Sequence, residues 1–498
     1  METPQSHDDP NTMSDPQENT PDDRKTGKSR NRGVKETMNG IELRRRNIRI
    51  RLIIASGGLV LVAVLAAIAT IYPGTEGFRN QLDRMVATAT GADVVLEGVE
   101  LTAFKATARQ LDASWPEGSP LASFRAEHLS ADVMPQRYFG RSFGGDELRA
   151  LRGKLMLRYP DAADARLPDA GGQSTISFNR IGIPEFEIHF GDPNAPASAM
   201  VTDAEAAFYP RGTGGLPRAM LYSGSLDIPF WPVLVLERAI VEFPQGTSRI
   251  ISMRLRDGEV EITSEIQPGS CDVSGEISHD PEVASTLAVE FQEFQLQSLI
   301  GDEAGRIFRG RVDSRRGEGR GIVRVSKEDG VQMRAELMGS GNSHIEFHHF
   351  PFLRFLAESL DDNWFRTPIF DDEPLMVLIR DGADISFEDI EFTARHRMAI
   401  RGALSIDVED QISGKIELGI APGVIDVAIA RRLDGMFSAE RDGFRWITLE
   451  LGGSTQMPVD DFNAQFIDAP LPQLDMPVPP ALPPTQREDE DLDGDKGD

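Results

Sequence analysis

The sequence has little cysteine and comparatively little positive charge. Cys271 is the single cysteine, so an intrachain disulfide framework and a cysteine-based metal site are both excluded. Lysine and arginine number 52 against 80 aspartates and glutamates, which gives a formal net charge of -28. A surface this acidic repels nucleic acid and anionic lipid headgroups. We therefore expect no nucleic-acid partner.

Long apolar runs are also lacking, with one exception. Residues Leu52 to Tyr72, "LIIASGGLVLVAVLAAIATIY", carry no charge. As a helix this run spans roughly 31 Å, about the thickness of a bilayer's hydrocarbon layer. The segment before it is strongly basic, which predicts a cytoplasmic N-terminus. Ala67-Ile-Ala69 has the form of a signal-peptide cleavage site, but the apolar run and the segment before it are too long for one.

We therefore predict a single-pass membrane protein whose bulk lies on the side of the membrane opposite the cytoplasm. Residues 1–45 are polar and predict a disordered cytoplasmic tail, and 46–73 hold the anchor. Residues 469–498 are rich in proline and then acidic, which predicts an unpacked tail. Between them we place an N-terminal β-rich part, 74–300, and a C-terminal β-rich region, 301–468.

Alternation of apolar and polar residues dominates the stretch between anchor and tail. It appears in "ADVVLEGVELTAF" (Val95, Val99, Leu101), in "STISFNRIGIPEFEIHF", and in "GALSIDV" and "GKIELGI". This period of two predicts antiparallel strands with one apolar face. The fold class is therefore mainly β. The sheet could form a sandwich, close on itself or curl into an open groove, and periodicity does not choose among these.

Helical runs are few. One follows the anchor, in "TEGFRNQLDRMVATATG", where Phe78, Leu82, Met85 and Val86 share a face and Gly91 is a plausible C-cap. The other two cover 294–309 and 350–361. We therefore expect a few short helices at the margins of a large sheet.

Three stretches resemble the AsmA-like family of membrane-anchored, β-rich proteins. They are the anchor with "GADVVLEGVELTAFKATARQLDASWPEGSPLASFRAEHLSADVMP", then "GGLPRAMLYSGSLDIPFWPVLVLERAIVEF", and "FDDEPLMVLIRDGADISFEDIEFTARHRMAIRGALSIDVEDQISGKIELGI". The third is similar to the family's C-terminal region. The chain is much shorter than the longest members, and its acidic tail has no counterpart in the family.

The resemblance implies an elongated, curled β-sheet with an apolar groove that projects from the inner membrane into the periplasm. Family members are linked to envelope integrity and outer-membrane assembly, and the long ones to phospholipid transport. Phospholipid and other envelope proteins are the partners that it implies.

His344, His348 and His349 are the most conspicuous candidates for a metal site. His344 and His348 are four apart, which on a helix would let both bind one metal. In a strand the same two residues lie about 13 Å apart and cannot share an ion. Gly339, Gly341 and Pro351 oppose a helix here, so we predict a strand-to-helix junction with partly exposed imidazoles.

Two further motifs resemble ligand-binding loops, but each departs from the pattern that such a loop requires. Asp489, Asp491, Asp493 and Gly494 match the opening of an EF-hand loop, but the chain ends before the twelfth position. "RRGEGRG" at 315–321 is followed by a strand and predicts a turn instead of a phosphate cradle. No G-x-S-x-G motif is present. We predict no catalytic, cofactor-binding or metal-binding residues, no cofactor, and no enzymatic activity.

The predicted function is to hold or guide lipid acyl chains in a β-groove, in support of envelope biogenesis. The alternative is an anchored scaffold or interaction protein with a closed core, and a metal-dependent hydrolase that uses the histidines at 344–349 is third. Aromatic residues would line the groove under the first hypothesis and pack a core under the second. The residues concerned are Trp115, Trp231, Phe350, Phe352, Phe355 and Trp364.

Overall fold

The computed structural model describes most of the chain from Thr75 to Pro470. The described ranges are 75–102, 104–133, 143–159, 176–192, 196–210, 216–244, 246–257, 268–280, 282–315, 321–339, 344–370, 373–394, 396–425 and 431–470. The predicted anchor, Leu52 to Tyr72, and nearly all of both predicted tails lie outside them. So does the acidic motif at 489–494.

Strands make up most of the described chain, as the alternating pattern predicts, and they join in one sheet. The first fourteen are β1 (Asp93–Glu97), β2 (Glu100–Leu101), β3 (Lys105–Ser114), β4 (Leu121–Val133), β5 (Phe143–Arg149), β6 (Arg152–Leu157), β7 (Ile176–Phe190), β8 (Ala199–Tyr209), β9 (Arg218–Tyr222), β10 (Ser225–Asp227), β11 (Leu234–Glu242), β12 (Thr247–Arg256), β13 (Ser270–Ser278) and β14 (Ser285–Gln292).

The remaining strands continue the same sheet. They are β15 (Phe294–Gln295), β16 (Phe308–Ser314), β17 (Gly321–Ser326), β18 (Gly330–Met338), β19 (Ile345–Phe347), β20 (Ile369–Phe370), β21 (Leu375–Asp381), β22 (Asp384–Ala394), β23 (Met398–Ile406), β24 (Ile412–Ile420), β25 (Ala439–Arg441), β26 (Phe444–Gly453) and β27 (Pro458–Asp460).

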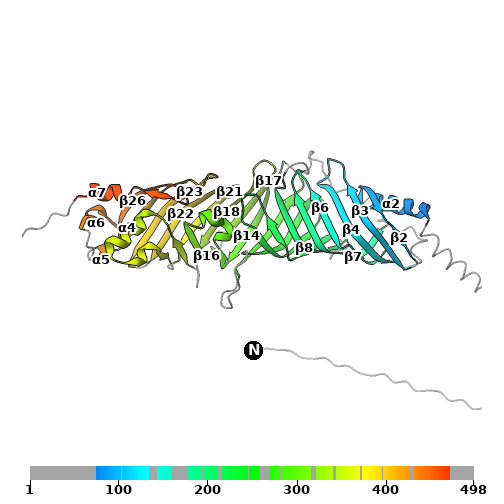
Figure 1. Ribbon diagram of the computed structural model, residues 1–498, viewed down its shortest axis with the longest axis horizontal. Helices are drawn as coiled ribbons and strands as arrows, with labels where there is room; N and C mark the ends of the chain where they lie inside the picture. Colours follow the sequence, from blue (N-terminus) through cyan, green and yellow to red (C-terminus); the bar gives the residue numbers. More distant parts are fainter. Residues whose placement is uncertain are drawn as a thin grey trace, which may run out of the picture. The chain divides into compact units, whose positions relative to one another are not determined.

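Neighbouring strands in the sheet are mostly neighbours in the sequence, so the colours in Figure 1 follow the chain from strand to strand. The order departs from the sequence where β14 pairs with β17, β18 with β21 and β24 with β26. Pairing is antiparallel, as predicted, except that β5 and β6 both lie parallel to the long strand β7. Parallel pairing requires a crossover connection instead of a hairpin, and residues 158–175 lie between β6 and β7 in the sequence.

Helices lie at the ends and on the inner side of the sheet. They are α2 (Glu76–Thr90), α3 (Gln297–Ala304), α4 (Pro351–Leu360), the 3₁₀ helix η4 (Asn363–Arg366), α5 (Pro422–Ile425), α6 (Arg431–Met436) and α7 (Phe462–Asp468). Gly91 ends α2 with a φ of 65°, which confirms the predicted C-cap.

The helix expected over 294–309 is shorter than predicted. Phe294 and Gln295 form strand β15 instead, and Gly301 interrupts α3 with a φ of 84°. A glycine with a positive φ interrupts the regular helix, and α3 ends at Ala304, before strand β16 begins at Phe308.

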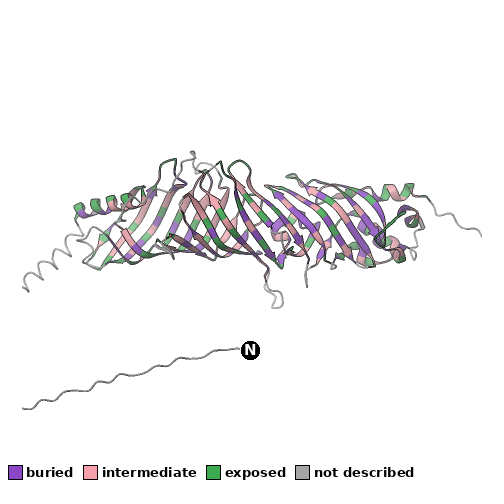
Figure 2. Cartoon of the chain, turned by 180° about the vertical axis from the view of Figure 1, so that it is seen from behind, coloured by how far each residue is buried: buried purple, intermediate pink, exposed green. Residues whose placement is uncertain are grey.

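Side-chain burial alternates along the strands, and Figure 2 shows this as changing bands of colour. The alternating pattern placed Val95 on the apolar face of its strand, and this prediction is wrong. Val95 is 58% exposed, while the neighbouring Leu96 faces inward. The short β1 therefore presents the opposite set of residues from the one that its apolar pattern indicated. In β22, by contrast, the inward residues Ile385, Phe387, Ile390 and Phe392 are all buried.

The inner side of the sheet differs between two regions, which we name here. The groove region comprises residues 75–292 with 321–333, and the closed core comprises 294–314 with 335–468. Phenylalanines fill the closed core and are almost fully buried there: Phe294, Phe308, Phe347, Phe350, Phe352, Phe365, Phe370, Phe387, Phe392, Phe437 and Phe462. The groove region has one phenylalanine buried to this degree, Phe186, among its described residues.

Candidate functional site

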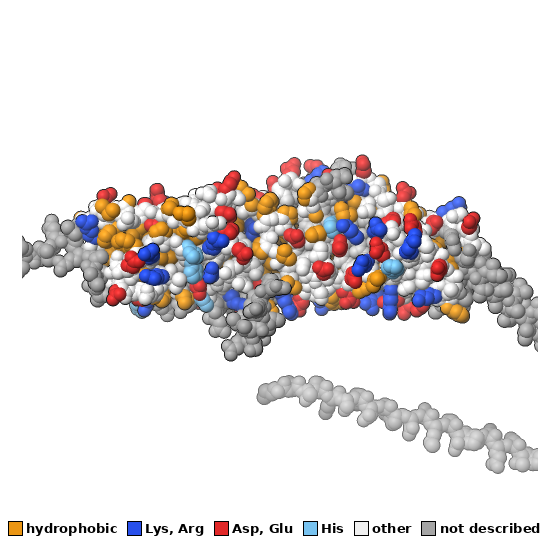
Figure 3. Space-filling view, viewed as in Figure 1, with side chains coloured by type: hydrophobic (Ala, Val, Ile, Leu, Met, Phe, Trp, Pro, Cys, Tyr) orange, Lys and Arg blue, Asp and Glu red, His pale blue; other side chains and the backbone are white. Residues whose placement is uncertain are grey.

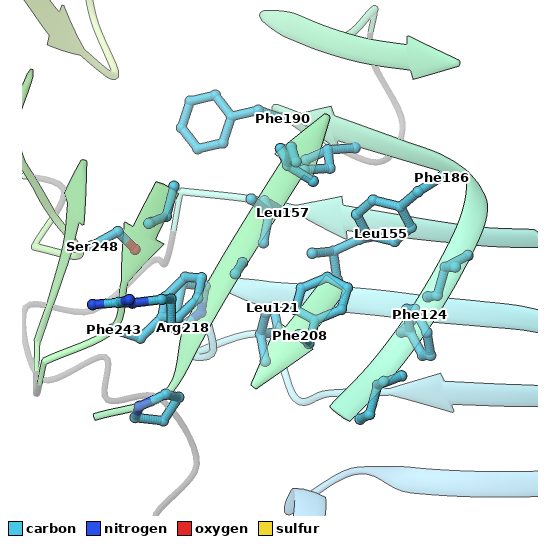
Figure 4. A pocket seen from close by; sticks show the side chains of 18 of the residues that line it. Leu121, Phe124, Leu155, Leu157, Phe186, Phe190, Phe208, Arg218, Phe243 and Ser248 are labelled. Atoms are coloured by element: carbon cyan, nitrogen blue, oxygen red, sulfur yellow. The ribbon is translucent and has the colours of Figure 1, made fainter. Parts of the chain in front are cut away.

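An apolar groove of about 1300 Å³ runs along the inner side of the sheet in the groove region. Figure 4 shows part of it, with Phe124, Leu155, Phe186 and Phe208 projecting from different strands into one space. The volume exceeds that of an ordinary small-molecule pocket. The groove can therefore hold a large apolar ligand.

The floor of the groove is apolar because each strand turns its alternate, apolar residues inward. On β14 these are Leu287, Val289 and Phe291, while Thr286 and Glu290 point outward and are exposed. Many inward side chains are only partly buried, since no second layer formed by the described residues covers them. They include Leu155, Ile188, Val241, Met253 and Val323.

Small side chains leave much of this space open. The inward positions of β3 are Ala106, Ala108, Leu111 and Ala113, and all four line the groove. An alanine adds little volume above the sheet. The small inward residues of β3 therefore leave space in this part of the groove, while larger residues of other strands, such as those of β14, form its floor.

Helix α2 closes one end of the groove. Phe78 and Leu82 pack with Val99, Phe143 and Phe178 in a small core of their own, and Leu82 also lines the groove. The indole nitrogen of Trp115, at the end of β3, donates to the carbonyl of Thr90 at 2.9 Å. This bond fastens the end of α2 to the rim of the sheet.

Trp231 and Leu299 form the other end. Both line the groove, and beyond them the inward residues Ala335 and Leu337 of β18 are completely buried. Behind Trp231 stands Arg380, which is 2% exposed and places its guanidinium 4.8 Å from the centre of the indole ring. This wall separates the groove from the closed core.

Arg380 holds the wall in place by hydrogen bonds to backbone. Its guanidinium donates to the carbonyls of Phe230, in the loop after β10, and of Leu299, in α3. Burial lowers the pKa of Arg380 to about 10. A buried cation without a carboxylate is costly, and here carbonyl dipoles and the indole face stabilise it.

Tyr159 bridges the two rims of the groove. It follows β6, and its hydroxyl donates to the carbonyl of Ser326 at the end of β17, 2.9 Å away. Its ring contacts Phe190 edge-on, and burial raises its pKa to about 12. The neighbouring Arg158 donates to the carbonyls of Trp115 and Ser119. These bonds close part of the groove's mouth.

The aromatic residues that the sequence left undecided divide between the two regions. Trp115 and Trp231 line the groove. Phe350 and Phe352 are buried in the closed core, and Phe355 and Trp364 pack against it. The helix expected over 350–361 forms as α4 and covers the closed core. Its apolar face meets the phenylalanines that fill that core.

The histidine stretch forms the predicted strand-to-helix junction. Ile345 and Phe347 of β19 are buried, and α4 begins at Pro351. The imidazoles of His344 and His348 contact the two carboxylate oxygens of Glu346 at 3.2 and 2.8 Å. Burial acts to raise the pKa of Glu346, but these two hydrogen bonds outweigh it and lower the pKa. His348 is buried, not partly exposed as expected, because it packs at the edge of the core.

Within the described part of the chain, no group of three or more histidine, cysteine, aspartate or glutamate residues is placed to hold a metal ion. Cys271 is buried and lines the groove, and burial raises the pKa of its thiol. Sequence reasoning missed Arg380 and Tyr159, because their partners lie far away in the chain and leave no local pattern.

None of the helices in the described ranges is both long and apolar enough to cross a membrane. Comparison with known proteins adds no identification: no family model, curated protein or solved structure matches the chain.

Proposed function

We propose that this chain is an AsmA-like, membrane-anchored protein whose groove binds the acyl chains of phospholipids. The observation that carries the proposal is the apolar groove of about 1300 Å³, lined by partly exposed leucine, isoleucine, valine and phenylalanine. Apolar surface that is open to water is costly unless something covers it. Acyl chains match the apolar chemistry of such a floor.

The apolar run at Leu52–Tyr72 supports an anchor in the inner membrane, with the sheet in the periplasm. Such an anchor would hold the groove near a source of lipid. In this role the protein would support envelope biogenesis by holding or guiding lipid, without catalysis. The alternative of a scaffold with a closed core fits residues 294–314 and 335–468, where large phenylalanine side chains are almost fully buried.

The test uses the full-length chain in detergent, mixed with phospholipid vesicles and examined by native mass spectrometry. Val323 and Ile322 provide matched variants, because they are adjacent on β17 and face opposite sides of the sheet. Val323→Glu places a charge in the floor and should abolish lipid retention. Ile322→Glu adds the same charge at a position that is 49% exposed on the outer face, and should retain lipid as the natural chain does.

Two results would contradict the proposal. One is a natural chain that carries no lipid after incubation with vesicles. The other is a folded Val323→Glu variant that retains as much lipid as Ile322→Glu. Urea unfolding of both variants separates loss of binding from loss of fold.

A further inference from the structure

The wall at the end of the groove joins residues from strands that are far apart in the curled sheet. Trp231 lies in the loop after β10, and Arg380, whose guanidinium is 4.8 Å from the centre of the indole ring, lies on β21. Seven strand-to-strand steps separate β10 from β21, which is roughly 34 Å along the sheet. Side chains so far apart in the sheet can touch only across its hollow side. The wall therefore crosses the groove instead of following one rim.

The groove lining next to the wall is apolar. Met333 lies directly opposite Arg380 in the register of β18 and β21, so the two side chains share the inner face. The backbone N–H of Trp231 donates to the carbonyl of Ile228 at 2.9 Å, and the carbonyl of Leu299 accepts from Arg380. Met333, Ile228 and Leu299 all line the groove. A charged headgroup would be costly to bury among them, whereas the methyl end of an acyl chain would not.

Trp231 presents a fixed surface to this end of the groove. Its side chain lines the groove and is only partly buried, so a ligand can touch it, whereas Leu299 and Met333 beside it are almost fully buried. Arg380 contacts the indole from behind and donates to the carbonyls of Phe230 and Leu299. The ring is therefore the accessible face of a wall that is held in place from the other side.

The Tyr159–Ser326 bridge lies near the wall, on the side toward α2. In the sheet, β17 is two steps from β21, and β6 is three steps from β10, so bridge and wall are roughly 10–14 Å apart. Arg158, next to Tyr159, is a charged residue that lines the groove. The groove thus has a charged lining residue at the bridge and an apolar end at the wall.

We propose that Trp231 is the stop against which the ends of bound acyl chains rest, so that the groove selects lipids by chain length. This inference rests on the proposed function. The chains would pass beneath the Tyr159–Ser326 bridge and end at the indole, while the headgroup stays on the other side of the bridge. Chains that are too long would leave methylenes outside the groove, in contact with water.

The test offers the full-length chain in detergent a choice of chain lengths. It is incubated with vesicles that contain, in equal amounts, diacyl phosphatidylcholines of graded chain length, and native mass spectrometry identifies the bound lipids by mass. A methylene that fits in the groove is out of water there as it is in the bilayer, so lengths below the limit should be bound in their vesicle proportions. Beyond the limit, binding should fall about fourfold for each methylene that the groove cannot cover.

Substitutions of Trp231 should move this limit. Trp231→Ala opens the end of the groove, so a lipid that exceeds the natural limit by two methylenes should be bound about tenfold more. Trp231→Phe keeps a ring against Arg380 and should shift the limit less, in the same direction. Trp364→Ala is the matched control, since Trp364 packs against the closed core with Arg397 4.9 Å from the centre of its ring. It should leave the limit unchanged.

A natural chain that binds every length in its vesicle proportion would overturn the inference while leaving acyl-chain binding intact. So would an unchanged limit in Trp231→Phe and Trp231→Ala chains that urea unfolding shows to be folded, or an equal shift in Trp364→Ala. If the natural chain binds none of the lipids, the proposed function itself fails, and the two failures are therefore distinguishable.

Discussion

The groove region and the closed core are built from the same kind of sheet and differ in the size of their inward residues. β3 turns three alanines and one leucine inward, whereas β22 turns two phenylalanines and two isoleucines inward. Both strands pair antiparallel with their neighbours. The phenylalanines of β22 contact Phe308 of β16 and Phe370 of β20 across the core, whereas the alanines of β3 are too small to reach across the groove. Larger inward side chains thus help to fill the closed core.

The two regions also differ in what covers the sheet. α4 and α7 pack against each other over the closed core, where Phe355 contacts Phe462 and Phe466. In the groove region, α2 closes one end and the floor stays open. The wall of Trp231 and Arg380 lies where one arrangement changes into the other.

The largest effect should come from emptying the closed core. Phe308 is 0% exposed, with its ring 4.4 Å from that of Phe387 and 5.2 Å from that of Phe347. Phe308→Ala should lower the free energy of unfolding by about 3–5 kcal/mol, because it leaves a cavity. Phe208 is partly buried and lines the groove, so Phe208→Ala should cost clearly less. Urea unfolding measures both, and equal losses would mean that the groove is packed as tightly as the core.

The wall between the regions should be the next most sensitive site. Arg380→Met removes the donors to the carbonyls of Phe230 and Leu299 and should lower the free energy of unfolding by about 2–4 kcal/mol. The loss is smaller than that expected from the hydrogen bonds alone, because the substitution also removes a buried charge. It should also make the 228–233 loop easier to cleave by limited proteolysis. The control is Arg324→Met, on the exposed face of β17. If Arg380→Met is as stable and as protease-resistant as Arg324→Met, Arg380 does not stabilise the wall.

Much of this architecture follows from local patterns in the sequence. Alternation predicts strands, Gly91 predicts the end of α2, and Pro351 predicts a strand that gives way to a helix. These succeed because the relevant interactions span only a few residues. The predicted strand-to-helix junction also explains why the histidine spacing does not form a metal site on a helix.

The remaining features depend on contacts between distant residues. The parallel pairing of β7, the Tyr159–Ser326 bridge and the Arg380 wall each join segments that no local pattern connects. Whether a stretch of sheet forms the groove or the closed core is partly indicated by the size of its inward residues, which the apolar and polar alternation does not record. Alanine dominates the inward positions of β3, whereas phenylalanine and isoleucine share most of those of β22, so residue volume carries information that hydrophobicity alone does not.

A smaller effect on the stability of the folded chain should appear in the groove region when the pH is lowered. Burial lowers the pKa of His279, so the unfolded chain takes up a proton there before the folded chain does. Its contribution to stability is therefore constant above the ordinary histidine pKa of about 6.5 and falls as the pH drops below it. His279→Phe should make urea midpoints less dependent on pH between 7 and 5 than in the natural chain. His349→Phe is the comparison for the closed-core side, since burial lowers the pKa of His349 as well. An unchanged pH dependence in His279→Phe would contradict this account.

Substitutions on the outer face of the sheet should change stability least, and by similar amounts in the two regions. Figure 3 shows acidic and basic side chains interspersed on the face that it draws. Arg254 pairs with Asp272 at 2.8 Å on the outer face of the groove region. Arg334, at the border of the closed core, pairs with Glu388 of that core at 3.1 Å on the outer face, and all four side chains are similarly exposed. Exposed pairs of this kind contribute about 0.2–1 kcal/mol each and weaken with salt. Arg254→Ala and Arg334→Ala should therefore have equally small effects on urea midpoints, and both effects should shrink at high salt. A clearly larger loss for one of them would mean that the regions differ outside as well as inside, and that inward side-chain volume alone does not explain the contrast between groove and core.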